Sequence, residues 1–186
     1  MATPDVRKVL RVNGRMCWNP TDLSGTYPFS GTALGAVTGA ALKLRAGHHV
    51  IRGEEYGGAA CDAVYTSQEV LLSVVLSAWD ADALSTVTQD SGAGATTARR
   101  VMRYRPSTEA VRAGSLVSAN AGVLYFSPDS DAYPGVLFRS ALPMLAENGS
   151  WPMNLGDEFG VPVIFLAVPN SSGNVYEVGL REDLTL

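Results

Sequence analysis

Two adjacent histidines, His48 and His49, are the only imidazoles in the chain and the first residues to consider for acid–base or metal chemistry. They lie in a segment whose pattern favours a β-strand, where successive side chains point to opposite faces. Side chains on opposite faces of a strand cannot bind one metal ion or act as a catalytic pair. We therefore expect one histidine to be buried and the other exposed, with no role in catalysis.

Paired carboxylates are the second group with chemical potential, because neighbouring acids can bind a hard cation or transfer protons. The pairs are Asp80 with Asp82, Asp129 with Asp131, and Asp157 with Glu158. Each pair offers two carboxylates, whereas a calcium site needs roughly six or more oxygen ligands. The pairs are therefore interpreted as turns and helix caps, with a loose Ca²⁺ site at the 129–131 loop as the alternative.

One basic cluster, ARRVMRYR, places arginines around Tyr104, where they could bind phosphates while the tyrosine stacks on a base. The arginines are Arg99, Arg100, Arg103 and Arg105. Against nucleic-acid binding stand the net charge of −4 and the absence of a known nucleic-acid-binding motif. Because arginine binds carboxylates in bidentate fashion, an intersubunit salt-bridge site is the favoured interpretation and nucleic-acid binding the alternative.

The remaining candidates lack the context that catalysis needs. The glycine-rich segment 91–97, SGAGATT, has neither the lysine nor the preceding strand of a phosphate-binding loop, so a flexible loop is expected at about 90–98. No serine lies in a G-x-S-x-G motif, and Cys17 and Cys61 have neither a nucleophile context nor metal-ligand spacing. We expect two free, buried thiols. We predict no catalytic, cofactor-binding or metal-binding residue and no enzymatic activity.

Composition favours a mainly β protein that self-associates. Hydrophobic residues make up 46% of the 186 residues and charged residues only 17%, so much of the surface must be neutral. The 19 glycines and 10 prolines separate mostly short apolar runs, as is typical of β-rich folds. Neither a signal-peptide pattern nor a membrane-length apolar run occurs, so we expect a protein made in the cytoplasm that does not span a membrane.

Charge is distributed unevenly along the chain. Residues 1–53 contain seven Arg or Lys against two acids, a net of +5, and residues 120–186 contain two against eight, a net of −6. Opposite signs on different parts of one molecule provide complementary surfaces for head-to-tail assembly. Chance is the alternative explanation for a monomer.

The elements that position these residues are predicted as one domain over 1–186. Residues 19–39 are expected to form an extended arm or long loop anchored by Tyr27 and Phe29. We expect this segment and the loop around Ser91 to contact other subunits. An acidic, glycine-containing turn at 54–58 is expected to precede the short extended segment CDAVYT. The next segment, EVLLSVVLSAW, is predicted to be a strand that is buried on much of both faces. A short helical turn is expected to begin at Asp80. Further predicted strands are AALKLR, GVLYFS and GVLFRSALPML, and VPVIFLAVP with NVYEVGL is expected to form a hairpin around 170–173.

This pattern resembles the major tail tube proteins of tailed bacteriophages, in which an acidic turn precedes a "D-x-V-Y" element and a strand ending in an aromatic residue with an acid. A second likeness lies in VLFRSALPML followed by GVPVIFLAVPNSSGNVYEVG, similar to the closing strands of that family. The two likenesses cover roughly half of the chain, with no counterpart between Asp90 and Asp131. The matching residues of the first are Glu54, Glu55, Tyr56, Gly57, Asp62, Val64, Tyr65, Trp79 and Asp80.

The resemblance implies a tail-tube-like β-sandwich or barrel with one short flanking helix and long loops. It also implies hexameric rings stacked into a tube in the virion tail, which contacts other tail or connector proteins and passes DNA without binding it specifically. Arg99 to Arg105 would then face a subunit contact or the outer surface rather than the lumen. Alternatives are a head-to-tail connector, a tail terminator or a capsid decoration protein, and, in another class, a metal- or glycan-binding module.

Overall fold

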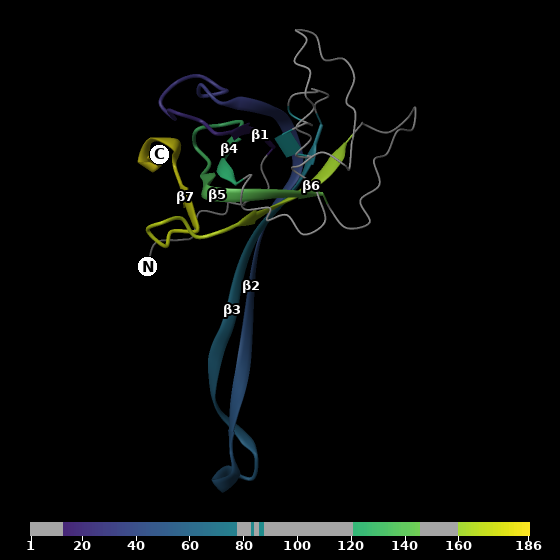
Figure 1. Ribbon diagram of the computed structural model, residues 1–186, viewed down its shortest axis with the longest axis vertical. Helices are drawn as coiled ribbons and strands as arrows, with labels where there is room; N and C mark the ends of the chain where they lie inside the picture. The colour runs from purple at the N-terminus through teal and green to yellow at the C-terminus, as the bar shows by residue number, and fades with distance from the viewer. Residues whose placement is uncertain (1–12, 78–82, 84–85, 88–120, 146–159) are drawn as a thin grey trace.

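The computed structural model describes residues 13–77, 83, 86–87, 121–145 and 160–186 (Figure 1). This part of the chain is mainly β, as the sequence predicted. Two short 3₁₀ turns, Glu54–Tyr56 and Arg181–Asp183, accompany the strands. The strands are β1 Gly14–Trp18, β2 Thr32–Gly53, β3 Ala59–Leu76, β4 Gly122–Pro128, β5 Gly135–Leu145, β6 Val161–Ala167 and β7 Tyr176–Gly179.

The strands form one antiparallel sheet in the order β4-β1-β2-β3-β6-β5-β7, and β4 also pairs with β5. Because β4 pairs with both β1 and β5, the pairing of strands β1 to β6 forms a closed circuit, and β7 is attached to β5 outside it. The predicted hairpin of β6 with β7 is wrong. The turn itself exists, since Asn170 Oδ1 accepts hydrogen bonds from the backbone N–H groups of Ser172 and Asn174, but both strands pair with β5.

The core forms where the strands turn alternate side chains toward one another. In β6 the inward positions are Val161, Val163, Phe165 and Ala167, all buried, and the positions between them are partly exposed. Phe165 is fully buried, with its ring centroid 6.2 Å from that of Trp18. Such alternation is the sequence signature of a strand with one buried face.

The inner half of β3 confirms the prediction of a strand buried on much of both faces. Consecutive residues Val70, Leu71 and Leu72 are each at most 8% exposed, so side chains on both faces are covered. The strand ends at Leu76, and Trp79 and Asp80 lie outside the described residues. A helical backbone is present at Ala83, Thr86 and Val87, and Ala83 and Val87 are buried. The remainder of the expected flanking helix lies outside the described residues.

The arm or long loop predicted at 19–39 is shorter than expected and packs against the body. Residues 32–39 belong to β2. Residues 32–37 pair with β1, and Leu34 and Val37 pack into the core. In the loop that remains, the Tyr27 hydroxyl donates to Met16 O at 2.9 Å and accepts from Gly35 N at 3.0 Å, beside a register shift between β1 and β2. Phe29 is 2% exposed, so Tyr27 and Phe29 do anchor this segment, but onto its own chain.

Candidate assembly surface

The most conspicuous feature of the molecule is a two-stranded hairpin that projects from the body (Figure 1). On one side, β1 accompanies β2 only from Thr32 to Val37. On the other, β6 accompanies β3 only from Val70 to Leu76. We call the outer part of the hairpin, residues 44–69, the arm. At about 3.3 Å per residue its strands extend roughly 35 Å, and among the described residues they pair only with each other.

The tip of the arm is the acidic, glycine-containing turn that the sequence predicted. Glu54–Tyr56 forms a 3₁₀ turn, and Gly57 and Gly58 follow with φ of 65° and 81°, a left-handed conformation that side chains disfavour. The Arg52 guanidinium donates to Gly58 O at 3.0 Å and closes the turn. The tip is therefore fixed locally, without help from the body.

Four large apolar side chains of the arm are exposed to solvent. Their exposed fractions are 62% for Leu44, 43% for Ile51, 51% for Val64 and 76% for Tyr65. A hairpin of two strands has no core in which to bury such residues and is marginally stable alone in water. Exposed apolar surface on an unpaired strand edge is a template for association with another chain. The arm thus combines two features that a partner would cover.

The apolar side chains lie on both faces of the arm. Tyr65 pairs with His48, and alternation along β2 puts Leu44 on the same face. Val64 pairs with His49, on the face that also carries Ile51. The two histidines do point to opposite faces, as predicted, but both are exposed, so the expectation that one is buried is wrong. Among the described residues, the large apolar side chains on both faces of the arm remain exposed, because the arm projects beyond the body.

The two strands of the arm differ in charge. β2 contains Lys43, Arg45 and Arg52 and no acid along its whole length. β3 contains Asp62 and Glu69 and no base. Arg45 and Glu69 are directly opposite each other, which favours the hairpin register, since opposite charges across a strand pair attract. The β2 strand of the arm is therefore basic and the β3 strand acidic.

The cysteines are both free, as predicted, but only one is buried. Cys17 lies in the body, where its thiol donates to Pro28 O at 2.7 Å, and burial raises its pKa to about 11. Cys61 lies on the arm and is exposed, contrary to expectation, because the strand that carries it has no covering layer. Neither thiol is part of a group of potential metal ligands in the described residues.

Of the paired carboxylates and the arginine cluster, the structure describes Asp129 and Asp131. Asp131 accepts a hydrogen bond from Arg181 at 3.2 Å in an exposed ion pair, and no group of three or more potential metal ligands occurs in this part of the chain. The backbone N–H of Asp129 donates to Asn13 O at 3.1 Å. The remaining predicted site residues lie outside the described part of the structure. They are Asp80, Asp82, Arg99, Arg100, Arg103, Tyr104, Arg105, Asp157, Glu158 and the loop at 90–98.

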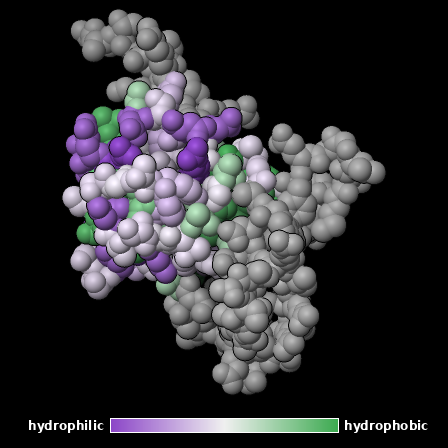
Figure 2. Space-filling view, turned by 90° about the horizontal axis from the view of Figure 1, so that it is seen from above, coloured by the Kyte–Doolittle hydropathy of each residue, from purple (hydrophilic) through white to green (hydrophobic). Residues whose placement is uncertain are grey.

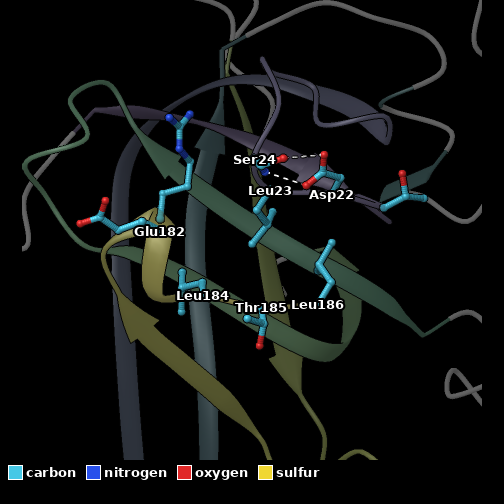
Figure 3. A pocket seen from close by; sticks show the side chains of 9 residues that line it. Asp22, Leu23, Ser24, Glu182, Leu184, Thr185 and Leu186 are labelled. Atoms are coloured by element: carbon cyan, nitrogen blue, oxygen red, sulfur yellow. Dashed lines mark hydrogen bonds between the residues drawn. The ribbon is translucent and has the colours of Figure 1, made fainter.

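One cleft of about 650 Å³ lies between the 21–24 loop and the C-terminal segment (Figure 3). Two of its polar residues bond to each other: Asp22 accepts hydrogen bonds from the Ser24 N–H and hydroxyl, both at 2.8 Å, which lower the pKa of its carboxyl. Leu23 and Leu184 supply apolar wall. These groups do not form a nucleophile, base and orienting partner in hydrogen-bond reach, the arrangement that covalent catalysis needs.

The end of the body opposite the arm is mostly polar or neutral where the structure describes it (Figure 2). In the residues described, no helix has the length and apolar character needed to cross a bilayer.

No protein-family model matches the chain, and no curated protein shows significant similarity to it.

Proposed function

We propose that this chain is a structural protein of a phage virion, a tail tube subunit that forms hexameric rings, which stack into the conduit for DNA. The observation that carries the proposal is the arm, with its unpaired strand edges and four exposed apolar side chains. A surface of this kind favours a partner, and a low charge content favours copies of the same chain as that partner.

The proposed fold is a tail-tube-like β-sandwich or barrel with a short flanking helix. Its support is the circuit of pairing in which β4 contacts both β1 and β5, since a sheet closed on itself leaves few edges for unspecific association. The arm and β7 are then the places where edges remain. The helical backbone at Ala83, Thr86 and Val87 is compatible with the flanking helix.

In a tube the work of the subunit is geometric and electrostatic. A neutral or acidic lumen repels the DNA backbone and lets it slide, whereas a ring of arginines would hold it. The net charge of −4 favours passage, provided that Arg99, Arg100, Arg103 and Arg105 face a subunit contact or the outer surface. The proposed protein binds no cofactor, catalyses no reaction, and resides in the virion tail after synthesis in the host cytoplasm.

Negative-stain electron microscopy of the purified chain at increasing concentration tests this proposal. Six-fold rings or long tubes are expected. Trimers or monomers that coat shells would instead indicate a capsid decoration protein, and single closed rings that never stack would indicate a connector or tail terminator. A thermal shift with Ca²⁺ or glycans, together with a monomer at all concentrations, would replace the proposal with a binding module.

A further inference from the structure

A second exposed apolar surface lies at the C-terminal side of the body. It consists of Val178 on β7, which is 42% exposed, Leu180 at 37% and Leu186 at 44%. With the neighbouring acids Glu182 and Asp183 we call it the C-terminal patch. The arm and this patch together contain every exposed large hydrophobic residue of the described part of the chain. The exposed large hydrophobic residues of the described part therefore belong to two segments of the chain, the arm and residues 178–186.

The C-terminal patch is also an unpaired strand edge. Among the described residues β7 pairs only with β5, and it stands at the end of the strand order. In one molecule the arm projects away from the body that carries β7, so the outer arm does not reach the β7 edge of its own chain (Figure 1). Contact between the two surfaces therefore requires a second copy.

The charges of the two surfaces are complementary. Two ion pairs occur near β7 in the described residues, Arg139 with Glu177 at 2.8 Å and Arg181 with Asp131 at 3.2 Å. Neither uses Glu182 or Asp183, which are exposed, so the patch presents acidic groups. The β2 strand of the arm presents Arg45 and Arg52, with His48 and His49 between them, and no acid.

We propose that the β2 edge of the arm, between Arg45 and Arg52, adds as a strand to the β7 edge of a second copy. Strand addition satisfies main-chain groups on both edges, and Ile51 covers apolar surface of Val178 and Leu180. The basic β2 strand then lies beside the acidic C-terminal patch. The contact is head-to-tail, and such contacts form rings or filaments. The inference rests on the proposed function and names the surfaces by which the subunits join.

A charge-swap experiment tests the contact in the full chain. One variant carries Arg45→Glu with Arg52→Glu, and the other carries Glu182→Lys with Asp183→Lys. Each alone is expected to lose assembly at concentrations where the unaltered chain assembles fully, because like charges then face each other. Mixed together they should recover assembly, since each arm now meets a patch of opposite charge on the other variant. Sedimentation velocity measures all three samples.

A matched control reverses a charge on the other arm strand through Asp62→Lys and leaves Glu69 in place opposite Arg45. Because β3 makes no main-chain pairing with β7 in the proposed contact, this variant should assemble like the unaltered chain. If it loses assembly while the patch variant keeps it, arms pair with arms and the proposal is wrong. Failure of the mixed variants to recover assembly, with each folded by circular dichroism, also overturns it.

The exposed Cys61 permits a test without mutation of charges. A thiol-directed photocrosslinker on Cys61 of the assembled chain should join residues 174–186 of another copy, as read by mass spectrometry. Crosslinks confined to the arm of another copy would exclude the contact. If the charge swap recovers assembly but microscopy shows open filaments without six-fold rings, the contact stands and the tube function fails. A chain that stays monomeric excludes both.

Discussion

Tyr65 offers the sharpest separation between assembly and monomer stability. Its side chain is 76% exposed, so about a quarter is covered within the monomer. A tyrosine buries roughly 150–250 Å² when fully covered, which leaves on the order of 110–190 Å² available to a partner. If half of that area is covered on assembly, burial at about 25 cal/mol per Å² means that Tyr65 contributes about 2 kcal/mol to the free energy of association at each intersubunit contact.

The substitution Tyr65→Ala should therefore raise the concentration at half-assembly by roughly 30-fold, because about 1.4 kcal/mol corresponds to a factor of ten. The free energy of unfolding of the monomer should fall by about 1.5 kcal/mol at most, from the quarter of the side chain that is already covered. Sedimentation velocity across a concentration series measures the first quantity and urea denaturation below the assembly threshold the second.

Two controls accompany this variant. Tyr65→Phe keeps the ring and should assemble like the unaltered chain, and Tyr133→Ala alters a partly exposed tyrosine outside both the arm and the C-terminal patch and should do the same. Assembly of Tyr65→Ala at the unaltered concentration would refute the argument that the arm is covered by a partner.

Three further predictions concern the body. Phe165→Ala should lower the free energy of unfolding by about 3–5 kcal/mol in urea denaturation, since Phe165 is fully buried; a loss below about 1 kcal/mol would contradict the core assignment. Tyr27→Phe should lower the free energy of unfolding by about 1–3 kcal/mol in the same measurement, because the Tyr27 hydroxyl bridges β1 and β2. An unchanged denaturation midpoint would show that this bridge is dispensable. Burial raises the pKa of Cys17 from 9.0 to about 11, so Ellman's reagent at pH 8 should modify Cys61 rapidly and Cys17 only after unfolding. The unfolded thiol ionises first, so the contribution of Cys17 to stability is present below about pH 9 and is lost as the pH rises toward 11; equal labelling rates of the two thiols would contradict this.

Most strands could be predicted from the sequence because their cause is local. The valines and leucines of 70–76 and the alternation in VPVIFLA produce β3 and β6 by themselves. The acidic turn at Glu54–Tyr56 was likewise predicted, since adjacent glycines mark a turn wherever they lie.

The arm was missed because its strands have the same local pattern as half-buried strands. AALKLR alternates in polarity and HHVIR contains the β-branched pair Val50 and Ile51, so both favour a strand. Whether a layer covers them depends on where β1 and β6 end, which is a property of the tertiary structure. The exposure of His48, His49 and Cys61 follows from the same cause. The most useful signal in the sequence was the polar composition of CDAVYTSQE beside the apolar run that follows it.

The strand that pairs with β7 also could not be predicted from the local sequence. NVYEVGL follows a real turn at 170–173, and adjacent strands joined by a turn commonly form a hairpin. Here β5 pairs with β7 through Gly135 to Phe138 and with β6 through Ala141 to Leu145. The length of β5 decides this arrangement, because one long strand can pair with two short strands in succession.

The central claim is that the arm joins copies of this chain, and shortening it tests that claim most directly. Replacing residues 45–69 by a two-residue turn joins the paired residues Leu44 and Val70 and leaves Leu72 and the rest of the core cluster in place. The shortened chain should therefore fold with a thermal midpoint near that of the full chain. Sedimentation velocity of both proteins at matched concentrations should show ring-sized or larger particles for the full chain and a monomer for the shortened one. Equal assembly of the two, or a full chain that stays monomeric throughout, would contradict the account.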